Sequence, residues 1–301
     1  MMLLAGMNDS AVSLNSTGSF SCPSLMIEEQ CKLLILHKTH HKNIIMASLV
    51  ICMIAIVVNT MEIGLLGKKK KRSKTELILL SLSTADLITA INLAIIRLNG
   101  LNLIPPEGFI YILVLTFSMI LISIMHLLVM TVERTVAVTA PFWHKANITR
   151  KRVQITLSIL WLNQLFMYLG KLLLFKKGNI SFNRAMIMYL KFVSIVFFLT
   201  SIIIFISYAV IITKVKSSLK EGSSNEEYSS RKRKQRRLII ITCLISGTCF
   251  ICYLPYTIVA WFSIVWVFRF QFCLCLSTLL NPLVYFFSSI YMQRINNRKT
   301  P

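Results

Sequence analysis

Seven long apolar stretches restrict the folds open to this chain more than any other feature of it. They cover residues 44–66, 76–98, 109–132, 153–174, 186–212, 238–264 and 270–290. A helix needs about 20 such residues to cross the hydrocarbon core of a bilayer, and each stretch is long enough. Hydrophobic residues make up 55% of the 301-residue chain, more than a soluble domain of this length can bury. The sequence therefore predicts an all-α membrane protein, a bundle of seven transmembrane helices joined by short linkers.

The distribution of basic residues predicts how this bundle is oriented. Of the 33 Lys and Arg residues, 23 lie on one side of the membrane and 10 on the other. The richer side carries the runs at 68–74, 214–220 and 231–237, and cytoplasmic segments hold such an excess. We therefore expect the N-terminus outside the cell. The net charge of +22 then reflects topology and contact with anionic lipid headgroups, not nucleic-acid binding.

The predicted topology divides the chain into three segments. Residues 1–43 form an extracellular N-terminal segment, 44–290 the transmembrane bundle, and 291–301 a short cytoplasmic tail. Residues 287–298 fit a brief amphipathic helix that follows span seven along the cytoplasmic membrane surface. No cleavable signal peptide stands out, so span one is expected to act as the targeting signal.

Two kinds of covalent modification are expected in the extracellular segments. The sequons at Asn8, Asn15 and Asn179 all lie outside the cell in this topology, and we expect glycosylation there. Cys22 and Cys31 form the only cysteine pair in an extracellular, oxidising segment. They predict a small disulfide-closed loop within the N-terminal segment.

Two short motifs stand out against this apolar background. Glu133 and Arg134 form a charged pair at the cytoplasmic end of the third span. Asn281 and Pro282, followed by Tyr285, lie within the seventh. A proline inside a span removes a backbone hydrogen bond, and an asparagine there must find a partner away from lipid. Together the motifs and the seven spans resemble a rhodopsin-like (class A) G-protein-coupled receptor.

This resemblance implies a conformational switch on the cytoplasmic side. The carboxylate of Glu133 holds the guanidinium of Arg134 in the resting state, and its release lets Arg134 reach toward a G protein. Tyr208 matches the tyrosine that meets Arg134 in the active state, and Pro255 marks a kink in span six. Tyr253 replaces the tryptophan of that span's usual motif. The switch residues implied are Glu133, Arg134, Tyr208, Tyr253, Pro255, Asn281, Pro282 and Tyr285. An interfacial ion pair at a helix end is the alternative reading of Glu133 and Arg134.

The resemblance also implies a polar centre inside the bundle. A carboxylate in the middle of a span is costly in lipid, so Asp86 should face the interior. The implied set is Asn59, Asp86, Ser123 and Asn281, and in the family it binds a sodium ion. A polar hydrogen-bond network without an ion is the alternative. No spacing typical of other metal ligands occurs, and we expect no other cofactor.

Trp161 in span four matches a tryptophan of the family whose indole makes hydrogen bonds with side chains of spans two and three. Ser81 and His126 align with those partner positions. We therefore interpret His126 as a structural histidine rather than as a proton sensor or metal ligand.

Several departures from the family pattern carry information. Phe109 stands where span three usually has a cysteine, and no cysteine occurs between positions 52 and 243, so the usual extracellular disulfide cannot form. The usual Pro, Ile and Phe of the trigger cluster become Thr200, Ile124 and Cys249. Gln235 replaces an acidic residue that often restrains the span-three arginine, from which we hypothesise raised basal signalling.

The upper cavity implied by the resemblance is mostly apolar and aromatic. Its predicted lining is Arg97, Thr116, Phe117, Ile120, Phe192, Tyr256, Thr257 and Gln271. Thr116 stands where amine receptors place an aspartate, which argues against an amine ligand. Arg97, Lys171 and Lys191 add positive charge near the opening, so an anionic lipid or another small molecule fits the chemistry. The alternative is that these cations extend to the membrane interface.

The predicted function is that of a plasma-membrane receptor that passes a ligand signal to a heterotrimeric G protein. A non-signalling protein that pairs with or traffics other receptors is the alternative, favoured by the altered trigger cluster and Tyr253. A transporter or channel is third, because the buried polar residues cluster around Asp86 and do not line a path. An enzyme is not expected, since no nucleophile and base set is evident.

Overall fold

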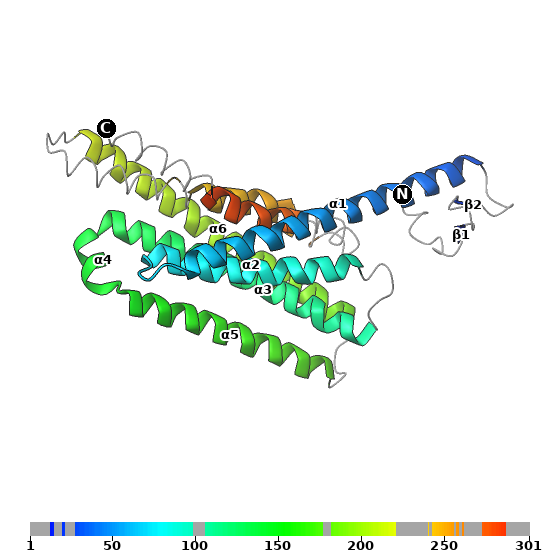
Figure 1. Cartoon of the computed structure of the whole chain (residues 1–301), viewed down its shortest axis with the longest axis horizontal. Helices are drawn as coiled ribbons and strands as arrows, with labels where there is room; N and C mark the ends of the chain where they lie inside the picture. The colour runs from blue at the N-terminus through cyan, green and yellow to red at the C-terminus, as the bar shows by residue number, and fades with distance from the viewer. Residues whose placement is uncertain are drawn as a thin grey trace. The chain divides into compact units, whose positions relative to one another are not determined.

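The chain folds into helices over nearly all of the residues described. A computed structural model describes residues 13–14, 20–21, 28–98, 106–176, 182–220, 240, 243–255, 257–258, 261 and 273–286. The labelled helices are α1 Glu28–Gly67, α2 Lys74–Leu98, α3 Pro106–Thr139, α4 Pro141–Asn147, α5 Arg150–Lys176 and α6 Phe182–Lys220 (Figure 1). Two shorter apolar helices follow, Cys243–Pro255 and Cys273–Phe286. The chain divides into two compact units, Met1–Ala47 and Ser48–Pro301.

The N-terminal unit contains secondary structure that the apolar pattern did not predict. Strand β1, Ser13–Leu14, pairs antiparallel with β2, Phe20–Ser21. Helix α1 begins at Glu28, well before the predicted start of span one at residue 44. Hydropathy detects the part of a helix that crosses a bilayer and not its polar extension, and the apolar part of α1 is Asn43–Gly67.

The predicted spans correspond to the helices of the larger unit. Among the described residues, five helices are long and apolar enough to cross a membrane, and the Cys243–Pro255 and Cys273–Phe286 helices are shorter apolar ones. These seven follow the order of the seven predicted spans. Helix α2 agrees best with its prediction, and α3 and α6 continue past the predicted ends of their spans. The protein is therefore an all-α, multi-pass membrane protein, consistent with a seven-helix bundle.

Capping contacts explain where the helices on the basic side begin. Ser73 precedes α2, and its hydroxyl accepts the Glu76 backbone N–H while the Glu76 carboxylate accepts the Ser73 N–H at 2.7 Å. This reciprocal capping box satisfies two backbone donors. Lys69 adds an ion pair to Glu76 at 2.6 Å, and this hydrogen bond raises the pKa of the Lys69 ammonium. Pro141 lies at the start of α4, where its missing N–H costs no hydrogen bond.

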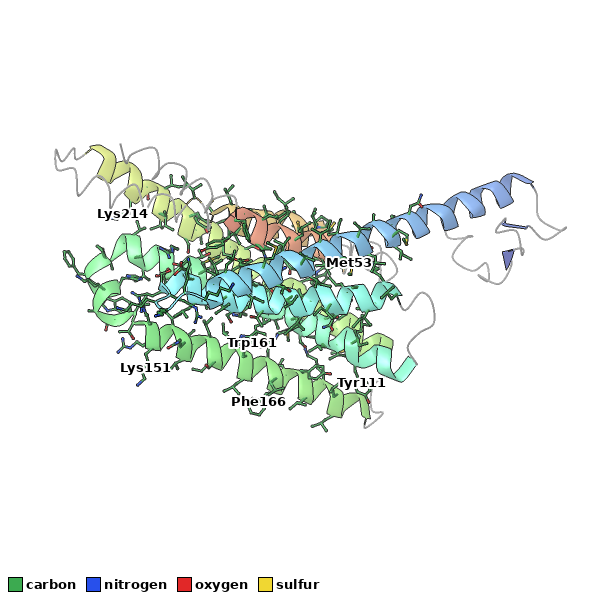
Figure 2. All side chains as sticks on the ribbon, viewed as in Figure 1. Met53, Tyr111, Lys151, Trp161, Phe166 and Lys214 are labelled. Atoms are coloured by element: carbon green, nitrogen blue, oxygen red, sulfur yellow. The ribbon has the colours of Figure 1, made fainter. Side chains whose placement is uncertain are left out.

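Helix α3 is the packing centre of the larger unit. It contacts α2, α4, α5 and α6. Of its most apolar window, 72% is buried within the protein, compared with 17% for α5, so most of α5 is left to face lipid. Figure 2 shows Trp161 on the side of α5 toward α2 and α3, and Phe166, which is 70% exposed, on the opposite side.

Helix α6 runs without a break past the position where the family pattern has a proline. Thr200 is buried there, and its hydroxyl donates to the backbone carbonyls of Val196 and Phe197, both at 2.9 Å. Threonine keeps its backbone N–H, so this position imposes no proline kink.

Candidate functional site

Asp86 forms the centre of a buried hydrogen-bond network that joins three helices. Ser123 of α3 donates its hydroxyl to Asp86 Oδ1 at 2.9 Å. Asn281 of the Cys273–Phe286 helix donates its amide to Asp86 Oδ2 at 2.8 Å. All three side chains are buried. The structure thus brings Asp86, Ser123 and Asn281 together as the sequence predicted.

Cys249 extends this network in a way that the sequence did not predict. It donates its thiol to Asn281 Oδ1 at 2.9 Å, which links the Cys243–Pro255 helix to the network. The sequence placed Cys249 in the trigger cluster and did not predict this contact. Asn59, the fourth predicted member of the polar centre, donates to the backbone carbonyls of Ala55 and Thr278 at 2.8 and 2.9 Å, and so fastens α1 to the Cys273–Phe286 helix.

Glu62 is a second buried carboxylate beside this network. It lies on α1, is 2% exposed, and is close enough to Asp86 for the two carboxylates to repel each other. Its Oε1 atom has no hydrogen-bond partner. One acidic residue changes the overall apolarity of a span very little, so this one did not stand out. A carboxylate within any apolar stretch was the signal that could have identified it.

The oxygen atoms of this centre are suitable ligands for a hard monovalent cation. Carboxylate and hydroxyl oxygens are the ligands that such ions prefer, and Asp86 and Ser123 supply them. The unpartnered Glu62 Oε1 is a further buried oxygen nearby. Both oxygens of Asp86 already accept hydrogen bonds, so the network is also complete without an ion.

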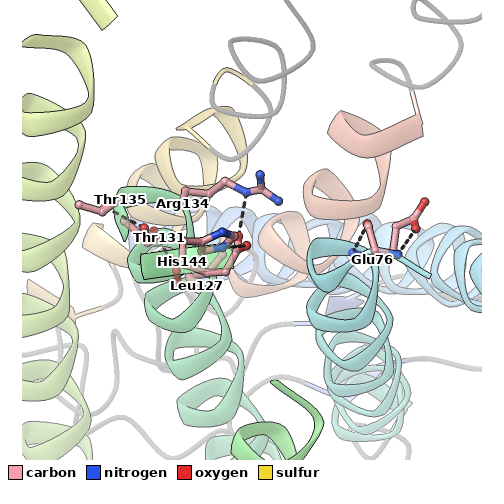
Figure 3. Close-up of polar contacts among 8 residues, drawn as sticks. Glu76, Leu127, Thr131, Arg134, Thr135 and His144 are labelled. Atoms are coloured by element: carbon pink, nitrogen blue, oxygen red, sulfur yellow. Dashed lines mark hydrogen bonds and ion pairs between the residues drawn. The ribbon is translucent and has the colours of Figure 1, made fainter. Parts of the chain in front are cut away.

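Glu133 and Arg134 form a buried pair near the C-terminal end of α3. Arg134 Nε lies 3.0 Å from Glu133 Oε2, a distance that makes an ion pair although the angle is not that of a hydrogen bond. His144 of α4 donates Nε2–H to the other carboxylate oxygen at 2.9 Å (Figure 3). The charge of Glu133 is thus shared between two helices.

His144 was not identified from the sequence. It is positioned because Pro141 starts a new short helix directly after α3, which returns His144 toward the end of α3. Thr135, which replaces the usual tyrosine after Arg134, donates back to the Thr131 carbonyl at 2.9 Å and stays within its own helix.

The other predicted switch residues lie at separate places. Tyr208 shares a hydrogen bond of 3.2 Å with Ser246 and lies near the Arg134 guanidinium. Tyr285 lies beside Lys69. Tyr253 is buried with its ring centroid 5.9 Å from that of Phe197.

The two prolines of the switch set both lie in helices. Pro255 closes the Cys243–Pro255 helix, and Pro282 lies within Cys273–Phe286 directly after Asn281. Each withholds a backbone N–H from its helix, so the preceding turn is a natural point for a bend.

Trp161, Ser81 and His126 form the structural network that was predicted. Trp161 Nε1 donates to Ser81 Oγ at 2.9 Å, and Ser81 Oγ lies 2.7 Å from His126 Nε2. His126 Nδ1 lies 2.7 Å from the Ile122 carbonyl, which can only accept. One arrangement satisfies every group, with Nδ1–H donating to Ile122 and Nε2 accepting from Ser81. His126 therefore has a structural role and, through Ser81, helps to fix α5 to α2 and α3.

The predicted pocket residues divide by burial. Thr116, Phe117, Ile120 and Thr257 are buried, and Thr116 donates to its own helix at the Ile112 carbonyl. Arg97 is also buried, near Cys52 and Cys275, and so does not extend into the interface. Those two cysteines are free thiols with sulfurs 3.1 Å apart.

Phe192 differs from the rest of the predicted pocket. It is 45% exposed, and its ring centroid lies 6.4 Å from that of Tyr189. Tyr256 and Gln271 lie outside the described residues.

Several other predicted features also lie outside the described part of the chain. These are the sequons at Asn8, Asn15 and Asn179, Cys22 of the predicted Cys22–Cys31 pair, Gln235 and the helix at 287–298; Cys31 itself lies in α1. They stay predictions.

Fold and site together define a helical multi-pass membrane protein with a charged pair at one helix end and a polar core. A comparison with family models agrees. Residues 56–285 match the model described as 7 transmembrane receptor (rhodopsin family). The chain belongs to this family, whose members are receptors and generally not enzymes. No curated protein matches the chain.

Proposed function

We propose that the chain is a plasma-membrane receptor that transmits the binding of an extracellular or lipid-borne ligand to heterotrimeric G proteins. The observation that carries this proposal is the buried Glu133–Arg134 ion pair, held from a second helix by His144. A buried pair linked to a movable element can have two discrete arrangements, as a switch requires. In this proposal the N-terminus lies outside the cell and the Arg134 end of α3 lies inside. A short cytoplasmic helix follows span seven.

In this proposal the Cys243–Pro255 helix moves during activation. It is joined to the polar centre by Cys249 and to α6 by Ser246, which contacts Tyr208. Movement at Pro255 would separate Ser246 from Tyr208 and open space beside Arg134. Arg134 would then leave Glu133 and contact the G protein.

We propose that a sodium ion bound at Asp86 favours the resting arrangement. Asp86 and Ser123 would hold the ion, and its charge would offset the repulsion between Asp86 and Glu62. The protein residues supply the site, and the ion supplies a positive charge in a region that otherwise holds two carboxylates.

Raised basal activity is part of the proposal, and its test needs no ligand. Cells expressing the chain are assayed for G-protein dissociation across several Gα subtypes, with Arg134→Ala at matched surface expression. We expect a basal signal that the variant loses. Gln235→Glu, which adds a restraining carboxylate, should lower the signal without abolishing ligand binding, since a partly exposed pair contributes about 0.2–1 kcal/mol.

A receptor-like partner that does not signal is the second candidate. Cys249 at the trigger position, bonded to Asn281, favours it, because that hydrogen bond fastens the helix that has to move. No basal signal in any subtype, together with none after Cys249→Phe, would favour this alternative over the receptor.

A further inference from the structure

Lys171 of α5 is turned into the protein toward two other helices. Its ammonium donates to the Ser118 hydroxyl of α3 at 3.1 Å and lies 3.7 Å from the ring centroid of Tyr189 on α6. Tyr189 is held in place because its hydroxyl donates to the Phe117 carbonyl at 3.1 Å. An ammonium extending to the membrane interface would point away from these groups, so Lys171 does not take that alternative role.

Among the residues that the structure describes, this cation has no acidic partner. No Asp or Glu occurs between Glu133 and Glu221, so α4, α5 and α6 carry none. In the part of the chain that the structure describes, no ion pair to Lys171 is formed either. An ammonium has three donors, and even a partly buried charge such as Lys171 gains from an opposite charge nearby. An anion from outside the chain would supply the missing charge.

Gln164 provides a second, independent feature beside Ser118. It is 4% exposed and donates its amide nitrogen to the Ser118 carbonyl, while its Oε1 atom has no partner. The backbone carbonyl can only accept, so the amide orientation is fixed and Oε1 remains an acceptor. A headgroup with both an anionic oxygen and a hydroxyl would bond Lys171 and Gln164 together.

The surroundings of Lys171 fit a ligand with an apolar chain. Met167 lies one turn below Lys171 on α5 and is 39% exposed, and Phe192 is exposed beside Tyr189 on α6. Both lie in membrane-spanning windows, where exposed apolar side chains contact acyl chains. The same place therefore offers a positive charge to a headgroup and apolar surface to a chain.

We propose that Lys171 binds the phosphate, and Gln164 the hydroxyl, of the headgroup of a single-chain lipid, whose acyl chain lies over Met167 and Phe192. Ser118 positions the Lys171 ammonium, because its own hydroxyl donates to the Val114 carbonyl at 2.9 Å. This inference deepens the proposed function because it names the ligand class. It concerns binding alone, so it stands or fails separately from G-protein coupling.

The test uses the full chain in nanodiscs of zwitterionic phosphatidylcholine. The probes are 1-oleoyl-glycerol 3-phosphate, the same molecule without phosphate (1-oleoylglycerol), and inorganic phosphate. We expect saturable binding of the first and at least about tenfold weaker binding of the other two, as a charge-assisted hydrogen bond contributes about that factor. Equal binding of 1-oleoylglycerol would overturn the role of the charge. Equal binding of inorganic phosphate would overturn the lipid source and leave an anion site.

Variants separate the charge of Lys171 from its packing. Lys171→Gln should weaken binding of 1-oleoyl-glycerol 3-phosphate at least about tenfold, while Lys171→Arg restores most of it. Lys191→Gln is the matched control, because Lys191 is a cation on α6 that lies over the Trp261 ring at 5.4 Å. An unchanged affinity in Lys171→Gln, or an equal loss in Lys191→Gln, would overturn the site. Binding that is retained by a chain with no G-protein signal would overturn the proposed function and leave the site intact.

Discussion

Asp86 is a buried carboxylate and Lys171 a partly buried ammonium, and the fold surrounds the two in opposite ways. Asp86 accepts a hydrogen bond on each carboxylate oxygen, from Ser123 and from Asn281. Lys171 contacts a hydroxyl and an aromatic face and no carboxylate. A buried charge is tolerated only when its surroundings supply compensation. The protein itself supplies the hydrogen-bond donors that Asp86 needs, whereas the negative charge that would compensate Lys171 has to come from a bound anion.

The difference follows from where each charge lies. Asp86 lies on α2, among helices that bury each other. Its two partners come from α3 and from the Cys273–Phe286 helix. Lys171 is on α5, most of which faces lipid, and it reaches α3 and α6 across an edge of the bundle. A site at an edge is accessible to molecules dissolved in the membrane. A site at the centre holds the helices together.

Removing the Asp86 carboxylate should have the largest effect. Asp86→Ala leaves the Ser123 hydroxyl and the Asn281 amide as buried donors without acceptors, at about 1–3 kcal/mol each. We expect the free energy of unfolding to fall by about 2–6 kcal/mol, seen as a lower midpoint of thermal unfolding in detergent micelles.

Asp86→Asn is the matched variant for this prediction. Its side chain keeps one acceptor oxygen and nearly the same volume, so it should lose clearly less stability than Asp86→Ala. Equal losses of stability in the two variants would show that the hydrogen bonds to position 86 do not contribute to stability. Asp86 would then not be a charge compensated by the protein, and the comparison with Lys171 would fail.

Replacing Glu62 should act in the opposite direction. Glu62→Gln keeps the shape of the side chain but removes a carboxylate that lies near Asp86 and has an unpartnered oxygen. We expect a gain of about 1–3 kcal/mol in the free energy of unfolding in choline chloride, where no small cation is present.

Sodium chloride at the same ionic strength provides the contrast. A bound ion stabilises the folded state in proportion to its occupancy, so sodium should raise the unfolding midpoint of the natural chain. Sodium should raise the unfolding midpoint of the Glu62→Gln variant by a smaller amount. A Glu62→Gln variant that is less stable in both salts would contradict the view that this carboxylate is an uncompensated charge.

The sequence predicted most of the fold for a simple physical reason. Crossing a bilayer requires length and apolarity, and both are readable from the chain. The polar extension of α1 back to Glu28 and the short helix α4 were not predicted, because neither depends on apolar length. Proline at position 141 was the available signal for α4.

The site was predictable where a residue type has one common use inside a membrane. Asp86 was expected inside because a carboxylate is costly in lipid, and the family resemblance implied that Ser123 and Asn281 meet it there, as they do. The hydrogen bond from Cys249 to Asn281 was missed because a thiol usually packs as an apolar group. The contacts of Lys171 could not be predicted, because a lysine near a helix end fits an interfacial role equally well and only the fold shows which way it turns.

The smallest effect on stability, and the sharpest test of the comparison, is expected when the Lys171 centre is given its own acid. Ser118→Asp places a carboxylate beside the ammonium that now lies 3.1 Å from the Ser118 hydroxyl. The attraction and the cost of burying a second charge nearly offset each other, so the free energy of unfolding should change by no more than about 1 kcal/mol. Binding of 1-oleoyl-glycerol 3-phosphate should nevertheless weaken at least about tenfold, since its headgroup then competes with an internal carboxylate. Ser118→Asn, which is similar in size and uncharged, should keep most of the binding.

Combining Ser118→Asp with Lys171→Gln removes the cation that pairs with the new carboxylate. That carboxylate would then be buried unpaired and should destabilise the chain by about 3 kcal/mol or more. A double-mutant cycle therefore measures the coupling of the two charges directly. Coupling near zero would mean that position 118 does not face the ammonium, and the Lys171 centre would then be no counterpart of the one at Asp86.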